Sequence, residues 1–92
     1  MERKVYTYPA VFYYDHDGIS IVFPDLPGCL PCADTAEEAF AHAREAMGVH
    51  LFGMEQDGDP IPEPTPVAEL HPENGGVVVM IDVYMPSIRS NR

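Results

Sequence analysis

The chain has 92 residues, of which 46% are hydrophobic, and its formal net charge at pH 7 is −10. This length is enough for one small domain with a modest core, and it leaves little room for a deep active-site cleft. The excess of acidic side chains repels phosphate backbones and so argues against direct nucleic-acid binding; it favours a basic protein partner, although the same charge also serves solubility alone.

The chain begins with a predicted β-hairpin. Residues 5–14, VYTYPAVFYY, are rich in β-branched and aromatic residues and predict a strand. Pro9 lies inside this run and has no N–H, so the strand is expected at a sheet edge or with a bulge. DHDG at residues 15–18 has turn chemistry, and the alternation ISIVF at residues 19–23 predicts the returning strand.

A loop and a short third strand are predicted next. Pro24 and Pro27 bracket the loop FPDLPG, and residues 29–33 are long enough for a strand before Asp34.

A helix is predicted from Ala36 onward. Thr35 and Glu38 have the spacing of a capping box, in which each side chain satisfies a backbone donor of the first turn. Apolar residues recur along one predicted helical face, at Ala36, Phe40, Ala43, Met47, Leu51 and Met54. Gly48 and Gly53 each cost about 1 kcal/mol relative to alanine, so the last turns are expected to be weaker than the first. DGD at residues 57–59 is expected to end the helix.

The segment after the helix alternates proline with other residues. PIPEPTP at residues 60–66 forbids helix and favours an extended, stiff connection. Such a segment serves either as an internal crossover, which we favour, or as a ligand for an aromatic groove of the SH3 type. ENGG at residues 73–76 then turns the chain into VVVMIDVYM at residues 77–85, whose nearly continuous apolar run predicts a strand buried on both faces.

The predicted order of elements is therefore β-β-β-α-β. It implies an α+β domain in which a small, mostly antiparallel sheet of three or four strands carries one helix on one face. We expect residues 1–86 to form this domain and residues 87–92 to form a tail.

The spacing Cys29-Leu30-Pro31-Cys32 raises the question of a redox or zinc site. Both cysteines precede the predicted N-cap, so neither gains the helix dipole that lowers the pKa of a reactive thiol. A structural zinc ion needs four ligands, whereas only one cysteine pair is present and the histidines are scattered. We expect no metal or cofactor, with Cys29 as a buried apolar residue and Cys32 as incidental.

Carboxylates are numerous but show no spacing that belongs to a reaction. Asp15, Asp17, Asp25 and Asp34 fall in turns or ahead of the helix, where capping and turn geometry require such residues. No nucleophile triad and no phosphate-binding glycine loop is present. We therefore expect a protein that is not an enzyme.

Val49 and Phe52 favour protein contacts. If the helix continues past Gly48, both side chains lie almost opposite the apolar stripe, on the polar face, and are candidates for an oligomer interface. If the helix instead bends at Gly48, Phe52 enters the core. The sequence favours neither interpretation over the other.

No apolar run approaches the roughly 20 residues of a membrane span. The charged start MERK is not followed by the apolar core of a signal peptide. Two cysteines cannot build a disulfide framework, which fits a reducing compartment. We expect a cytoplasmic protein that has no membrane segment.

Four stretches together resemble the N-terminal domain of the HicB antitoxin family. They are YPAVFYYDHDGISIVFPDLPGC, ADTAEEAFAHAREAM, DGDPIPEPT and VVVMIDVYM, in the family's order and spacing over residues 8–85. The family's PGC signature includes Cys29 but not the position of Cys32.

The resemblance implies an incomplete ribonuclease-H-like fold without its catalytic carboxylates. It implies an antitoxin that binds and masks a small basic HicA-type toxin, which cleaves mRNA, and that assembles as a homo-dimer or tetramer. Partner contacts are expected at Asp25, Asp34, Glu37 and Glu38. An alternative is a stand-alone domain that binds another protein or a small ligand.

Family members usually carry a DNA-binding domain after the last strand, whereas this chain stops at SIRSNR. Arg89 and Arg92 would suit the start of a linker to such a domain. Six residues cannot form a DNA-reading module, so no direct operator binding is expected from this chain.

Overall fold

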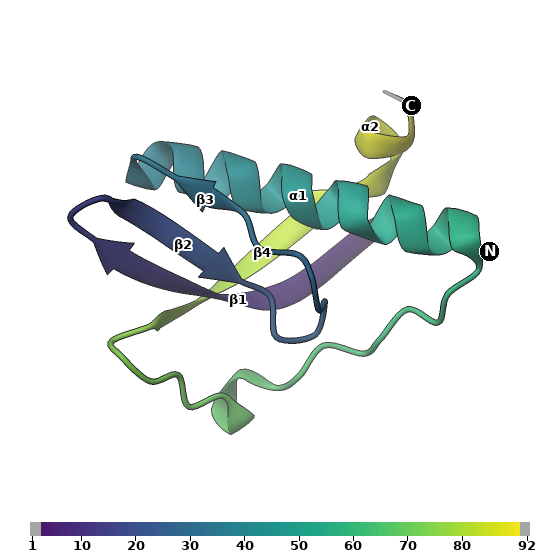
Figure 1. Ribbon diagram of the computed structural model, residues 1–92. Coiled ribbons are helices and arrows are strands. Elements are labelled where there is room, and N and C mark those ends of the chain that lie inside the picture. The colour runs from purple at the N-terminus through teal and green to yellow at the C-terminus, as the bar shows by residue number, and fades with distance from the viewer. Residues whose placement is uncertain (1–2, 91–92) are drawn as a thin grey trace.

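The computed structural model describes residues 3–90 and shows one sheet with a long helix across one face (Figure 1). The first two strands are β1 (Val5–Asp15) and β2 (Gly18–Val22), which pair antiparallel with Asp15 opposite Gly18. The predicted hairpin is confirmed. Gly18 has a φ of 142°, and a Cβ on it would lie 2.8 Å from the carbonyl oxygen of Ala33, so this position requires glycine.

The sheet order is β3-β2-β1-β4, so β1 is a central strand and the expectation of an edge strand at Pro9 was wrong. Pro9 is tolerated because of its register. The Met85 N–H donates to the Lys4 carbonyl at 2.7 Å, and bonded pairs recur at every second residue of an antiparallel ladder, so Pro9, opposite Met80, falls between them. Its nitrogen points to the side where the β2 ladder has ended at Val22.

Strand β3 (Cys32–Ala33) pairs with β2 and is shorter than the predicted 29–33. The residues before it lie outside the strand. The Cys29 N–H donates to the Leu26 carbonyl at 3.0 Å in a turn, and the Pro31 carbonyl accepts from the Ile21 N–H at 2.9 Å at the end of the β2–β3 ladder.

The helix α1 (Ala36–Asp57) begins at the predicted cap, where the Glu38 N–H donates to the Thr35 hydroxyl oxygen at 3.2 Å. It ends at Gly58, whose φ of 72° is left-handed. The buried face consists of Ala39, Ala43, Met47, Gly48 and Leu51, so the predicted stripe is only partly correct.

Phe40 was predicted on the buried stripe but lies at its margin, because small residues on α1 let the helix approach the sheet closely. Ala39 and Ala43 occupy the contact, and Phe40 stays 41% exposed at its margin. The Phe40 ring still meets Phe12, with ring centroids 5.4 Å apart.

After α1 the chain runs along the side of the sheet away from the helix and contains one 3₁₀ turn, η1 (Val67–Glu69) (Figure 1). It is held to the domain at two points. The Tyr8 hydroxyl donates to the Pro62 carbonyl, and Asp25 accepts two hydrogen bonds from Thr65. The proline-rich segment is thus an internal crossover, as favoured from the sequence.

Strand β4 (Val77–Tyr84) pairs with β1 at the open edge of the sheet. The prediction that it is buried on both faces was wrong. Ile81 and Val83 face the core, whereas Met80 and Tyr84 are 47% and 55% exposed. The apolar run reflects an edge strand with an uncovered outer face.

A second helix, α2 (Met85–Ser90), follows β4 directly where a tail was expected from residue 87. Ile88 packs against the core. Residues 91 and 92, which include Arg92, lie outside the described part of the chain.

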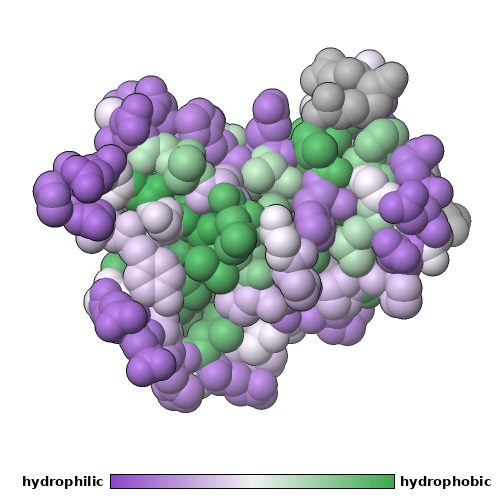
Figure 2. All heavy atoms as spheres, viewed as in Figure 1, coloured by the Kyte–Doolittle hydropathy of each residue, from purple (hydrophilic) through white to green (hydrophobic). Residues whose placement is uncertain are grey.

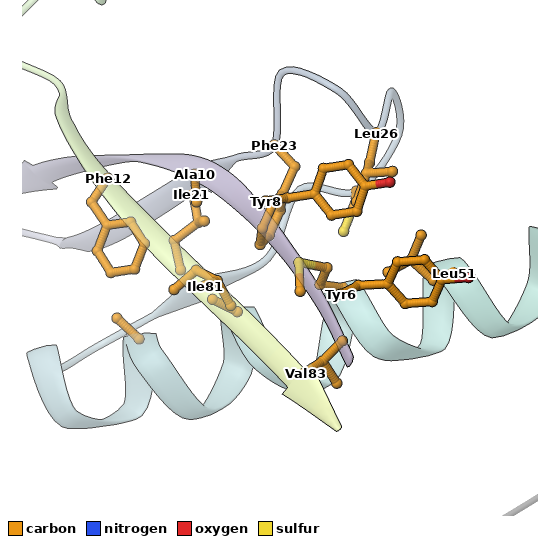
Figure 3. Close-up of a cluster of buried hydrophobic side chains, with 14 of the residues drawn as sticks. Tyr6, Tyr8, Ala10, Phe12, Ile21, Phe23, Leu26, Leu51, Ile81 and Val83 are labelled. Carbon is orange, nitrogen blue, oxygen red and sulfur yellow. The ribbon is translucent and has the colours of Figure 1, made fainter. Parts of the chain in front are cut away.

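The core lies between the sheet and α1. Side chains of β1, β2 and β4 point toward the helix, and Figure 3 shows Phe12, Ile21, Ile81 and Val83 turned toward it, with Leu51 projecting from α1. This confirms the predicted α+β architecture of one antiparallel sheet and one covering helix.

Candidate functional site

The cysteine pair lacks the properties of a redox site. Cys29 is buried, and burial raises the pKa of its thiol to about 11, so the thiol stays protonated near neutral pH. Cys32 is exposed at the start of β3, and both thiols are free. Cys29 is the buried packing residue that the sequence predicted.

Metal-ligating side chains do not gather in the part of the chain that the structure describes. Within residues 3–90 no group of three or more His, Cys, Asp or Glu side chains has a metal-binding arrangement. The same residues contain no helix with the length and apolar character for crossing a bilayer.

Asp25 lies apart from the other three predicted contact residues. Its Oδ2 accepts from the Thr65 N–H at 2.9 Å, and its Oδ1 accepts from the Thr65 hydroxyl at 2.5 Å. The carboxylate therefore fastens the FPDLPG loop to the crossover. This contact explains why an acidic residue stands at position 25 without any need for a contact with another protein.

Asp34, Glu37 and Glu38 lie together at the start of α1 and are exposed. The Glu38 carboxylate accepts from the Asp34 N–H at 3.3 Å, one residue before the N-cap. Acidic side chains here also complement the positive end of the helix dipole. Glu38 is thus engaged in the cap, whereas the Asp34 and Glu37 carboxylates accept no hydrogen bond from residues 3–90.

The structure adds the hairpin tip to this cluster. Asp15, Asp17 and Asp34 line one hollow of about 160 Å³, because Gly18 brings the turn against Ala33 and the start of the helix. We call Asp15, Asp17, Asp34, Glu37 and Glu38 the acidic end. The hairpin turn and the β2–β3 pairing were both predicted, but their juxtaposition depends on the register, which the sequence did not specify.

His16 lies at the same tip. Its Nδ1 is 2.9 Å from the Asp15 carboxylate, and its Nε2 is 3.6 Å from that of Asp17. All three side chains are exposed, so these contacts add little to stability.

Arg44 and Arg89 form hydrogen bonds on the side of the molecule away from the acidic end. The Arg44 Nε donates to the Asp82 carbonyl of β4 at 3.0 Å. Arg89 binds both carboxylate oxygens of Glu55, at 3.1 and 2.7 Å, and donates to the Arg3 carbonyl at 2.9 Å. In Figure 1 the hairpin tip and the start of α1 lie at the left, whereas α2 and the start of β1 lie at the right.

Tyr6 completes the cluster around Glu55. Its hydroxyl donates to Glu55 Oε2 at 3.0 Å, and burial, followed by the nearby Glu55 carboxylate, raises the pKa of Tyr6. The Arg3 guanidinium lies over the Tyr6 ring, 5.1 Å from its centroid. We call Tyr6, Glu55 and Arg89 the Glu55 clamp; it joins β1, α1 and α2.

Of the two candidate interface residues, only one is clearly exposed. The helix continues without a break through Gly48, and Val49 is 39% exposed. Phe52 is half-buried and packs against the core. The helix therefore needs no bend for Phe52 to reach the core.

Comparison with known proteins gives sequence relatives. The chain is 34% identical over 79 residues to an uncharacterized 14.9 kDa protein in the rep–hol intergenic region of Haemophilus phage HP1 (strain HP1c1), covering 83% of this chain and 59% of that protein. It is 37% identical over 62 residues to antitoxin HicB 2 of Photorhabdus laumondii subsp. laumondii, covering 67% and 45%. The chain thus spans about half the length of these relatives.

The fold and the family are shown by two further matches. A chain of a toxin–antitoxin complex from Streptococcus pneumoniae superposes with a TM-score of 0.81 at 20% identity, over 91% of this chain and 72% of that one, and so shares the fold. A family model described as HicB-like antitoxin of bacterial toxin–antitoxin systems matches residues 8–92. The resemblance found in the sequence is confirmed, and the chain belongs to the HicB-like antitoxin family.

Proposed function

We propose that this chain binds a small, basic, HicA-type mRNA-cleaving toxin and masks its RNA-binding surface. The observation that carries the proposal is the family match over residues 8–92. The net charge of −10 supports it, because an acidic body is attracted to a surface built for RNA and takes the place of RNA there.

In this function the chain acts by binding, without a reaction of its own, in the cytoplasm where mRNA is translated. The protonated Cys29 thiol and the Asp25 carboxylate held by Thr65 support a binding role, since both groups serve packing and loop attachment. The acidic surface also supports the absence of direct operator binding by these residues.

The first test is co-expression with the product of the small, basic reading frame beside this gene. We expect a stable complex on co-purification, and we expect mRNA cleavage by the toxin to fall as this chain is added in equimolar amounts. A soluble, active neighbour that is neither bound nor inhibited would reject the proposal and leave the alternative of a stand-alone domain with another protein or small ligand.

We also propose that the chain self-associates, as a dimer or tetramer, through the open edge of β4. This edge supports pairing because it is eight residues long and exposes Val77, Met80 and Tyr84. It also lies on the side that holds Arg44 and Arg89, so two acidic molecules meet there with less repulsion than at their acidic ends.

A further inference from the structure

A groove runs between the segment before β3 and the outer side of α1. It consists of two adjoining hollows, of about 340 and 420 Å³, which share Pro31, Ala46 and Val49. Leu30 and His50 line the first hollow, and His42 and Glu45 line the second. Figure 2 shows an apolar area below α1, in the region of β3, with hydrophilic side chains around it.

Both walls of the groove are held in place. On the loop side, Cys29 is buried, and the Pro31 carbonyl accepts from the Ile21 N–H at 2.9 Å. His42 Nδ1 on α1 lies 2.8 Å from the Cys32 carbonyl oxygen and ties the loop to the helix. A groove with such walls is preformed, so a partner does not have to order it on binding.

Folding leaves apolar side chains exposed on both walls. Leu30 follows buried Cys29 and is 66% exposed, and Val49 across the groove is 39% exposed. A pair of apolar side chains on fixed walls is suited to receive an apolar anchor from a protein partner, since interface energy concentrates in such central contacts.

The charges around the groove select the kind of partner. Glu45 is the acidic residue of its lining, and none of the Lys and Arg residues within 3–90 lines either hollow. Strand β3 leads from the groove to Asp34 at the acidic end. Arg44 and Arg89 are occupied on the β4 and α2 side. A second copy of this chain or a nucleic acid would bring more negative charge to this face, whereas a basic protein segment is complementary to it.

We propose that this groove is where the toxin docks: a basic segment inserts an apolar side chain between Leu30 and Val49, and its Lys or Arg side chains meet Glu45 and the acidic end. The inference rests on the proposed function and goes beyond it by assigning the surface. It also gives Val49 a role in partner binding, while self-association uses β4.

The test compares two identical substitutions on the same fold. Val49→Glu places a charge in the groove, and glutamate suits a helix at least as well as valine does. Val67→Glu is the matched control, because Val67 is 46% exposed on η1, away from the groove. Leu30→Ser is a second groove variant outside any helix. Circular dichroism and thermal melts establish that all three variants are folded.

Toxin binding by calorimetry and inhibition of mRNA cleavage are then measured for each variant. We expect Val49→Glu and Leu30→Ser to raise the Kd at least about tenfold, as for central interface anchors, and Val67→Glu to change it less than about threefold. If the wild-type chain does not bind the toxin, the proposed function fails. If it binds and both groove variants bind as tightly as Val67→Glu, the function stands and the groove assignment is overturned. Loss of self-association in the groove variants, with toxin binding intact, overturns it in favour of a second copy.

Discussion

Gly48 lies at the position on α1 where α2 and β4 pack against the helix. A Cβ on Gly48 would lie 2.7 Å from Ile88 Cγ1 and 2.9 Å from Val83 Cγ2, whereas a Cβ on Gly53 would meet nothing within 4 Å. From the sequence both glycines only weaken the helix. They differ because the contact needs α2, which the sequence did not predict.

The two glycines therefore respond in opposite directions to alanine. Gly53→Ala is expected to raise the free energy of unfolding by up to about 1 kcal/mol through helix propensity. Gly48→Ala gains the same propensity but forces Ile88 and Val83 apart, which costs about 1 to 3 kcal/mol, so a net loss is expected. Urea unfolding of both variants measures this, and an equal gain at both sites would show that α2 does not pack there.

The four predicted contact residues fall into two groups with different surroundings. Charge and motif placed Asp25 with Asp34, Glu37 and Glu38, but the bonds to Thr65 give Asp25 a separate structural task. Its partner lies 40 residues away across the crossover, and a separation of that size cannot be inferred from local patterns. The capping residues were predicted because their spacing is local.

Among the elements, the hairpin and the start of α1 were predictable because their signals lie within a few residues. The position of β4 was not, since an apolar run looks the same in a central strand and in an edge strand with a bare outer face.

The pairing of β4 with β1 shows which backbone groups of β4 point away from the sheet. Val83 and Ile81 bond toward β1, so the N–H of Met80 points away from the sheet, and the outward Asp82 carbonyl already accepts from Arg44.

This geometry gives a specific test of self-association at β4. Met80→Pro removes an outward donor without breaking the ladder to β1, and proline is tolerated at such positions. We expect the variant to keep its circular dichroism spectrum and to shift from dimer or tetramer toward monomer in light scattering. Val79→Pro is the control on the bonded side and is expected to lower the Tm strongly. Unchanged assembly in folded Met80→Pro would place the oligomer contact elsewhere.

The whole molecule has an uneven distribution of charge along its long axis. The acidic end combines the hairpin tip with the first turn of α1, and the described Lys and Arg residues are Arg3, Lys4, Arg44 and Arg89, none of which lies at this end. The total charge of −10 could be read from the sequence, but its separation could not, because it depends on how the sheet is assembled. Such a molecule orients a basic partner before contact.

Association with the toxin is therefore expected to depend strongly on salt. The association rate constant should fall about tenfold or more between about 50 mM and 0.5 M NaCl, with a smaller change in dissociation. Stopped-flow measurements on a variant with Asp15→Asn, Asp17→Asn and Asp34→Asn should show a flatter salt dependence. A control with Glu63→Gln, Glu69→Gln and Glu73→Gln on the crossover has the same net charge. Equal flattening in both variants would mean that only total charge matters.

The Glu55 clamp determines which end of the domain lies next to anything attached to the chain termini. Its Arg89 also donates to the Arg3 carbonyl, so the two ends of the described chain leave the domain at one pole. A sensor chip, a label or a fused protein attached through either end approaches that same pole. The acidic end lies at the opposite pole (Figure 1), so we expect an attachment through either end to leave it open to an incoming protein.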